Sequence, residues 1–111
     1  MFTLDQFKAE LLKIRQEPDR TGPPRYFRSP EGHLCLSGQV FTNLGYQIPS
    51  GCKDMMQFGI KWLSLPGETR SFIRLVCWSN NAGHSFHTII DHVLPQPIAA
   101  APEPEPELVT A

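Results

Sequence analysis

Residues 77–86 read Cys77-Trp78-Ser79-Asn80-Asn81-Ala82-Gly83-His84-Ser85-Phe86, and the rest of the chain is organised around them and a helix expected to continue to about His92. Asn-Asn-Ala-Gly is typical of a turn, because Asn tolerates left-handed backbone and Gly has no Cβ to clash. Ser85 suits the N-cap of the following helix, since its hydroxyl accepts an orphan amide of the first turn. The apolar residues beyond it recur at the spacing of one buried helical face. They are Phe86, Ile89, Ile90 and Val93.

The composition indicates one small domain and excludes several classes of protein. The chain has 111 residues and a formal charge of −1, but three of its 11 acidic residues lie near the proline-rich end, leaving 8 against 10 basic residues. That balance is too weak to indicate a nucleic-acid surface. No apolar run approaches the roughly 20 residues that span a bilayer, and residues 1–20 do not resemble a signal peptide. Three cysteines, an odd number, favour reduced thiols. We expect a cytoplasmic protein that binds neither membrane nor nucleic acid.

The first helix has the clearest signals in the chain. Thr3-Leu4-Asp5-Gln6 predicts a capping box, in which the side chains of Thr3 and Gln6 each accept from the other's backbone amide. Phe2 and Phe7 flank the cap as a hydrophobic staple. An apolar stripe follows, formed by Leu4, Phe7, Leu11 and Ile14 with Leu12 beside it. Pro18 ends the helix, because a residue before proline avoids helical geometry.

The middle of the chain predicts a long loop and shorter helices. Residues 17–32 form the loop, which ends in the turn 29–32, and a short hairpin is expected near residues 25–36. Ser37 is the expected cap of a helix over 38–44, which Gly45 terminates. A further helix is expected over about 53–64, ended by Pro66-Gly67. The apolar run 70–77 fits either a strand or a helix by its period; we favour a helix capped by Thr69 or Ser71.

These patterns predict a mainly α-helical bundle that forms a single domain over residues 1–94. Residues 95–111 alternate proline with glutamate and are expected to form a disordered, polyproline-like tail. The expected core follows from the apolar faces of the helices. It comprises Phe7, Leu11, Cys35, Val40, Phe41, Leu44, Trp62, Leu63, Phe86, Ile90 and Val93.

Three fragments of the chain have a familiar form. Residues 35–40 resemble a Cys-Ala-Leu-Gly-Ala-Leu-type segment, residues 55–65 a helix ending in Trp-Leu-Gly-Leu, and residues 80–86 an Asn-Asp-x-Gly-x-Ser/Thr-Phe segment that leads into a helix. In this order and spacing, they resemble a loose group of small uncharacterised bacterial and phage proteins. The resemblance implies no activity. Two positions depart from the group's pattern: Ser64 stands where Gly is usual, and Asn81 where Asp is usual. An amide cannot act as a base, which favours a structural role for this turn.

His84, His87 and Asp91 are the candidate metal ligands, because they fall within about 60° of one another at helical spacing and imidazole with carboxylate suits a divalent transition metal. The competing interpretation, which we prefer, is the ordinary polar face of an amphipathic helix, where His87 and Asp91 form an exposed ion pair. We expect no cofactor. A zinc cluster of the histidines and cysteines lacks a Cys-x-x-Cys knuckle.

Other candidate functional residues are weighed in the same way. Cys35 next to a histidine is a nucleophile–base pair in principle, but its apolar neighbours favour core packing. Trp62 and Trp78 are expected in the core or at a subunit contact, with an exposed anchor for a partner as the alternative. Arg25 and Arg28, together with Arg15 and Arg20, form the densest basic group, and we expect a solvated loop rather than a phosphate or acidic-partner site.

Two classes of function remain open. The first is a non-enzymatic binding protein, an accessory or host-modulating factor of a phage or mobile element, whose partner is another protein or a second copy in a homodimer. The second is a small metal-dependent or cysteine-dependent enzyme. An exposed apolar patch favours the first class, and a pocket that gathers His and Cys with perturbed pKa values favours the second.

Overall fold

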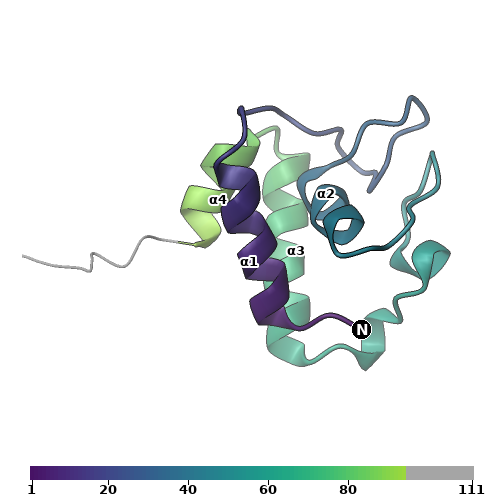
Figure 1. Ribbon diagram of the computed structural model, residues 1–111. Coiled ribbons are helices and arrows are strands. Elements are labelled where there is room, and N and C mark those ends of the chain that lie inside the picture. Colours follow the sequence, from purple (N-terminus) through teal and green to yellow (C-terminus); the bar gives the residue numbers. More distant parts are fainter. Residues whose placement is uncertain (95–111) are drawn as a thin grey trace, which may run out of the picture.

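Helices dominate the computed structural model, which describes residues 1–94 (Figure 1). They are α1 (Leu4–Arg15), α2 (Leu36–Asn43), the 3₁₀ helices η1 (Met55–Phe58) and η2 (Trp62–Ser64), α3 (Gly67–Asn81) and α4 (Phe86–Val93). In these residues there is no strand, and the expected hairpin is reduced to isolated bridges of Arg28 with Leu34 and with Cys52. The prediction of a mainly helical domain is confirmed, and the predicted tail, 95–111, lies outside the described residues.

The four α-helices pack in a closed arrangement. Helix α1 lies against α2 and α4, and α3 lies against the same two helices from the other side (Figure 1). The short connection over residues 82–85 makes α3 and α4 neighbours along the chain, whereas 20 residues separate α1 from α2. None of the helices in residues 1–94 is long and apolar enough to cross a membrane.

Helix α1 begins as the sequence predicts. The amide of Gln6 donates to Thr3 Oγ1 at 3.1 Å, and the amide of Thr3 donates to Gln6 Oε1 at 2.7 Å. The rings of Phe2 and Phe7 lie 6.1 Å apart, which is the expected staple. Leu12, beside the buried stripe, is half-exposed.

An aromatic cluster in the core surrounds Phe41 of α2. The ring of Phe41 is fully buried and contacts five other aromatic rings, with centroid distances of 5.3–6.2 Å. These rings are Phe2, Phe7, Phe27, Tyr46 and Phe58. Edge-to-face pairs of this kind add roughly 0.5–1.5 kcal/mol each to the burial of the rings. The cluster joins α1, α2, the long loop and η1 into one core.

Two of the expected helices differ from the prediction at their starts. Helix α2 begins at Leu36, because the sulfur of Cys35 accepts the amide of Gly38 at 3.3 Å, while Ser37, the predicted cap, is buried. The helix predicted over 53–64 is instead η1 and η2. Gly59 separates them with a φ of 93°, which only glycine adopts without strain.

Helix α3 is longer than the apolar run that predicted it. The helical interpretation of residues 70–77 is confirmed, but the helix starts at Gly67 after Pro66 and neither Thr69 nor Ser71 caps it. It also continues through Asn81, so the left-handed turn residue before α4 is Gly83, with a φ of 93°. Ser85 caps α4 by accepting the amide of Thr88, as predicted.

Most of the expected core residues are buried. Phe7, Leu11, Cys35, Val40, Phe41, Phe86, Ile90 and Val93 have at most 9% of their surface exposed. Leu44 and Trp62 are partly buried and pack against this core. The expectation for Leu63 is wrong: its side chain is 85% exposed on η2. Leu63 was expected in the core because a continuous helix over 53–64 would turn it inward. The chain breaks at Gly59 instead, so this helix does not form.

Candidate functional site

A hollow lined mainly by apolar side chains lies between α3 and α4, and we call it the α3–α4 groove. It has a volume of about 490 Å³. Its walls are Leu75, Trp78, Ser79 and Ala82 of the α3 side and His84, Thr88, Ile89 and His92 of the α4 side. The α3 residues recur at i, i+3, i+4 and i+7, so they form one stripe along the helix. No Lys, Arg, Asp or Glu lies among the walls.

Trp78 is the most prominent side chain of the groove. It is 72% exposed, so the expectation that it lies in the core is wrong: the indole faces outward, where a subunit or partner contact stays a prediction. The reason is its position on α3, whose buried side carries Ile73, Val76 and Asn80. Trp78 follows Val76 by two residues, about 200° around the helix, and therefore points away from the core. Trp62, by contrast, is partly buried, and the Arg74 guanidinium lies 5.6 Å from its ring.

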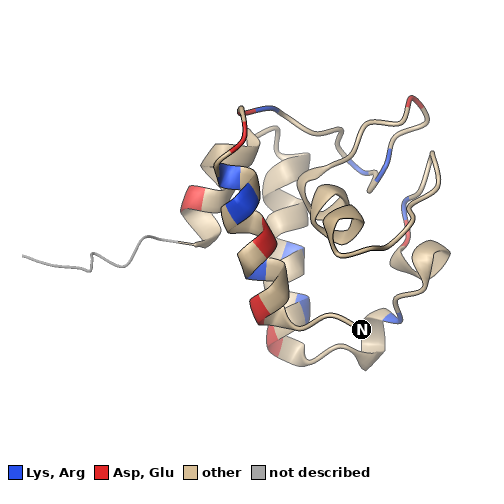
Figure 2. Cartoon of the chain, viewed as in Figure 1, with Lys and Arg blue, Asp and Glu red and all other residues tan. Residues whose placement is uncertain are grey.

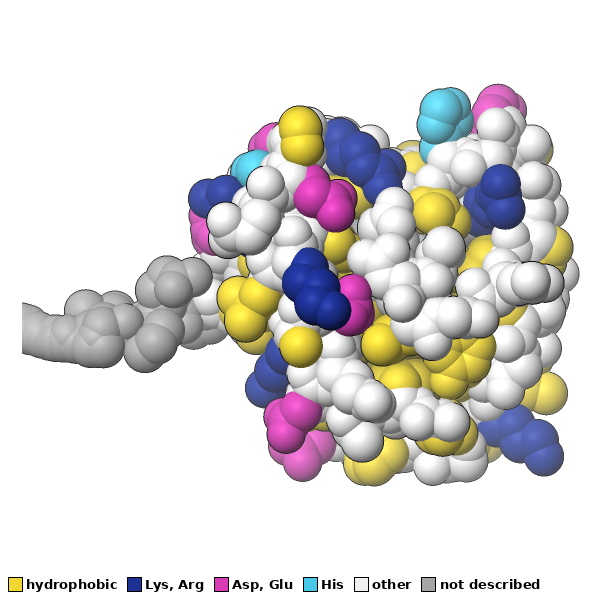
Figure 3. All heavy atoms as spheres, viewed as in Figure 1, with side chains coloured by type: hydrophobic (Ala, Val, Ile, Leu, Met, Phe, Trp, Pro, Cys, Tyr) yellow, Lys and Arg dark blue, Asp and Glu magenta, His cyan; other side chains and the backbone are white. Residues whose placement is uncertain are grey.

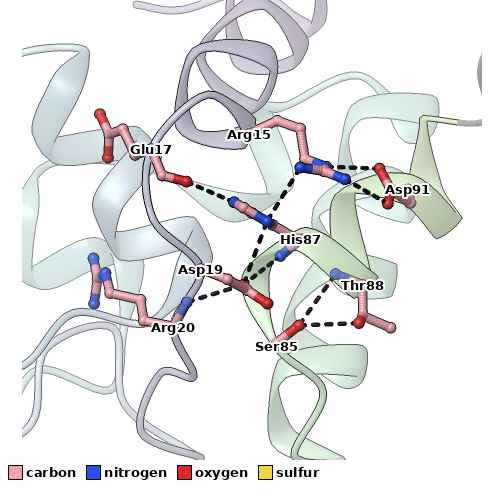
Figure 4. A network of polar contacts seen from close by, with 8 residues as sticks. All are labelled: Arg15, Glu17, Asp19, Arg20, Ser85, His87, Thr88 and Asp91. Carbon is pink, nitrogen blue, oxygen red and sulfur yellow. Dashed lines mark hydrogen bonds and ion pairs between the residues drawn. The ribbon is translucent and has the colours of Figure 1, made fainter.

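The candidate metal ligands do not come together. His84 belongs to the wall of the α3–α4 groove. His87 and Asp91 lie on the side of α4 that faces the end of α1, as Figure 4 shows. Asp91 binds Arg15 in a bidentate pair, with Nε–Oδ1 at 2.9 Å and Nη2–Oδ2 at 3.2 Å. Among residues 1–94, no three His, Cys, Asp or Glu side chains are arranged to hold a metal ion.

The contacts of His87 fix the orientation of its ring. Its Nε2 lies 2.7 Å from the carbonyl oxygen of Glu17, and its Nδ1 lies 3.1 Å from Nη1 of Arg15 and 4.0 Å from Oδ1 of Asp19. The ion pair expected between His87 and Asp91 is replaced by contacts of both residues with Arg15.

The loop after α1 also caps the start of α4 (Figure 4). Asp19 Oδ1 accepts the backbone amide of His87 at 2.9 Å, and the carbonyl of Arg20 accepts the amide of Phe86 at 2.7 Å. The hydrogen bond from the His87 amide holds the pKa of Asp19 below its usual range, and the hydrogen bond from Arg15 does the same for Asp91. These hydrogen bonds, together with those of Asp91, hold α4 against the end of α1 and the loop that follows it.

The three cysteines are poor candidates for nucleophiles. Burial raises the pKa of Cys35 to about 12, and burial also raises the pKa values of Cys52 and Cys77. A thiol with such a pKa is neutral at physiological pH, whereas the thiolate is the reactive form. Cys35 serves instead as the N-cap of α2, and Cys77 lies 3.4 Å from the hydroxyl of Ser37.

The four arginines of the basic group separate into two kinds. Arg15, Arg20 and Arg28 are engaged: Arg20 bonds the carbonyl of Leu34 and the side chain of Gln39, and Arg28 bonds the carbonyls of Gly32 and Ile48. Arg25 is exposed, and within residues 1–94 its guanidinium has no hydrogen bond or ion pair. Figure 2 shows basic residues along the loop between α1 and α2, whereas α2 itself has no charged residue.

Hydrophobic side chains also reach the surface near the start of the chain. On the face seen in Figure 3 they gather beside α1 and near the N-terminus. A smaller hollow of about 250 Å³ lies there, lined by Met1, Phe2, Gln6, Leu44, Gly45 and Tyr46. Its floor is part of the aromatic cluster, so it is a shallow opening onto the core.

The α3–α4 groove has a signal in the sequence that the single apolar face expected for a packed helix does not reveal. Leu75, Trp78 and Ala82 repeat at helical spacing beside the buried stripe of α3, which is more apolar surface than one core contact requires. Whether such a second stripe is covered depends on the tertiary arrangement, which spacing alone does not give.

In comparisons with protein-family models, curated proteins and solved structures, no match to this chain was found.

Proposed function

We propose that this protein is a non-enzymatic binding protein whose α3–α4 groove takes an amphipathic helix from another protein. The observation that carries the proposal is Trp78, 72% exposed at the edge of a groove with apolar walls. Tryptophan is enriched among the residues that dominate binding energy at protein interfaces. An exposed indole beside an unfilled apolar groove is a ready anchor for a partner.

The geometry of the groove supports a helical partner. Two consecutive helices in contact form its walls, and α3 presents its residues at i, i+3, i+4 and i+7. A third helix packs into such a groove through its own apolar residues at the same spacing. The only ionisable walls are His84 and His92, which supply hydrogen-bond donors for a carboxylate on the polar edge of that helix. The partner that we propose is therefore apolar on one face and acidic beside it.

The enzyme alternative receives less support from the same structure. The buried thiols are neutral, and Asp91 and His87 are engaged with Arg15. The setting that we propose for the binding protein follows from the resemblance of residues 35–86 to small bacterial and phage proteins: an accessory factor of a phage or mobile element that acts on a host protein in the cytoplasm.

The proposal is tested by selecting peptides from a random library against the full chain, with counter-selection on Trp78→Ala. We expect peptides with apolar residues at helical spacing, and a loss of at least about 30-fold in affinity on Trp78→Ala, since truncation of an anchor residue costs about 2 kcal/mol or more. Leu63→Ala is the matched control, because Leu63 is equally apolar and exposed but lies on η2.

Three outcomes would contradict the proposal. The selected peptides could bind Trp78→Ala as tightly as the wild type, or Leu63→Ala could weaken them as much. The third is self-association of the wild type in sedimentation that Trp78→Ala abolishes, which would assign the groove to a second copy of this chain instead of a different protein.

A further inference from the structure

A second groove lies on another side of α3, and its chemistry differs from that of the α3–α4 groove. It consists of two adjoining hollows of about 200 and 530 Å³ that share Phe27, Lys53 and Cys77 as walls. The first hollow is also lined by Arg25 and Tyr26, and the second by Trp62 and Arg74. We call this surface the basic aromatic groove and define it by Arg25, Tyr26, Phe27, Lys53, Trp62 and Arg74.

The cations of this groove are exposed and lie close to aromatic rings. The ammonium of Lys53 is 5.0 Å from the centre of the Tyr26 ring, and the guanidinium of Arg74 is 5.6 Å from the centre of the Trp62 ring. Arg25, Lys53 and Arg74 are all exposed. Asp54 is the one acidic residue that lines the groove. Its carboxylate already accepts a hydrogen bond from the amide of Met56 as the cap of η1. The groove therefore presents three positive charges over an aromatic floor.

The backbone of Arg25 is held in place by Asn81, the last residue of α3. Its φ of 68° is left-handed, a conformation that costs a non-glycine residue about 1–3 kcal/mol. A hydrogen bond of 2.8 Å from the Arg25 amide to Asn81 Oδ1 stabilises this strained backbone conformation. The backbone is thus fixed while the guanidinium stays exposed, which suits a residue that binds a ligand rather than one that stabilises the core.

The chain carries a segment of matching chemistry. Residues 102–107 are Pro-Glu-Pro-Glu-Pro-Glu, with three carboxylates for three cations. Proline-rich segments adopt the polyproline II conformation and dock in grooves lined by aromatic residues, where their low conformational entropy reduces the cost of binding. The proline rings can pack against the rings of Tyr26 and Trp62, and the carboxylates can form ion pairs with the cations beside those rings.

The segment can also reach the groove. The described chain ends at Leu94, after the last turn of α4. His92 in that turn lines the α3–α4 groove, and Leu75, the neighbour of Arg74, lines the same groove from α3. Residues 95–101 span at most about 23–25 Å when extended, at 3.3–3.6 Å per residue. A helix with its side chains is about 10–12 Å across. The seven residues are therefore long enough to pass around α3.

We propose that the Pro-Glu segment, residues 102–107, binds in the basic aromatic groove of its own chain. An attached segment has an effective concentration of the order of mM, so even weak contacts keep the groove occupied. The exposed charges make this contact sensitive to salt, because the screening length falls to about 3 Å at 1 M. This inference concerns a different surface from the α3–α4 groove and does not depend on the function proposed for that groove.

The test is paramagnetic relaxation in the full chain, with a nitroxide on Thr110→Cys. Cys35 and Cys52 are buried and Cys77 is mostly covered, so the new thiol is the one to react. We expect the amide signals of residues 25–27, 53–55 and 73–77 to lose more than half of their intensity. The loss should disappear at high salt and in the triple variant Glu103→Gln, Glu105→Gln, Glu107→Gln. Wild-type protein treated with the same label is the control for reaction at native cysteines.

A charge exchange separates specific contact from general attraction. Lys53→Glu with Arg74→Glu should abolish the effect, and adding Glu103→Lys, Glu105→Lys and Glu107→Lys should restore it; Trp78→Ala should leave it unchanged. Uniform broadening, or broadening centred on Trp78 and His92, would overturn the proposal. A second control mixes an isotope-labelled chain that has no nitroxide with an unlabelled chain that carries it. Signal loss in this mixture would show binding between molecules and would also overturn the proposal.

Discussion

At the scale of single residues, the buried Asn80 joins distant parts of the chain. Its side chain is 2% exposed; Nδ2 donates to the carbonyl of Pro23 at 2.9 Å, and Oδ1 accepts the amide of Leu36 at 3.3 Å. Gly22 lies beside it, and a Cβ there would come within 2.7 Å of Cys35 Cα and 2.8 Å of Asn80 Oδ1. From the sequence, Asn80 was predicted only to form part of a turn. Local spacing cannot show that its hydrogen-bond partners lie 44 and 57 residues away.

We expect Asn80→Ala to lower the free energy of unfolding by about 2–4 kcal/mol. The substitution leaves the Leu36 amide and the Pro23 carbonyl without partners, and each buried unsatisfied group costs about 1–3 kcal/mol. Urea denaturation followed by circular dichroism measures the change. Asn81→Asp is the control, since Asn81 acts on Arg25 through its acceptor oxygen, which a carboxylate retains; it should stay within about 0.5 kcal/mol. Equal stability of the wild type and Asn80→Ala would contradict this role.

At the scale of elements, the end of α1 and the start of α4 are joined by their polar side chains. Arg15 reaches Asp91 and His87, and the loop that follows α1 supplies acceptors for the first amides of α4. The helices themselves were predictable from capping residues and apolar spacing, as α1 and α4 show. The pairing of Arg15 with Asp91 was not, because residues 76 positions apart are brought together only by packing.

This pairing predicts a loss of stability in acid. The pKa values of Asp91 and Asp19 are lowered in the folded chain, by the hydrogen bonds from Arg15 and from the His87 amide respectively. Their contribution is therefore complete above the unfolded value of about 3.9 and is lost as the pH falls through the lower folded values. We expect the melting temperature to fall below about pH 4, and Asp91→Asn to reduce that fall.

Thermal melts between pH 2 and pH 7 measure the effect. Glu31→Gln, at the exposed tip of the turn 29–32, is the control and should reproduce the wild-type slope. If Asp91→Asn and the wild type lose the same number of degrees between pH 4 and pH 2, Asp91 does not contribute to stability through its ionised form.

At the scale of the whole molecule, the sequence predicted the helical class and most of the core, but not which apolar residues face outward. Phe86, Ile90 and Phe41 were placed correctly from spacing within single helices. Leu63 was not, because Gly59 changes the direction of the chain before it. Trp78 required knowing which neighbours α3 has on each side. The groove that we propose as the binding site is therefore a property of the packed helices and is invisible in any one of them.

Phe86→Ala should remove most of the stability of the domain. The ring is 1% exposed, and the Arg20 guanidinium lies 4.3 Å from its centre. Truncation of a buried Phe costs about 3–5 kcal/mol, compared with a total of about 5–15 kcal/mol for a typical domain. Chemical denaturation gives the value. A variant that unfolds at the wild-type denaturant concentration would show that the start of α4 is not central to the fold.

The capping of α4 by residues 19 and 20 also bears on the order in which the protein can fold as it is made. Asp19 and Arg20 leave the ribosome early, but the amides that they bind, on His87 and Phe86, are synthesised almost 70 residues later. The long loop meets Asn80 and Asn81 in the same late part of the chain. Closing a contact over such a separation costs chain entropy and slows folding relative to a helical protein with local contacts. The loop between α1 and α2 therefore cannot make its final contacts until α4 has been synthesised.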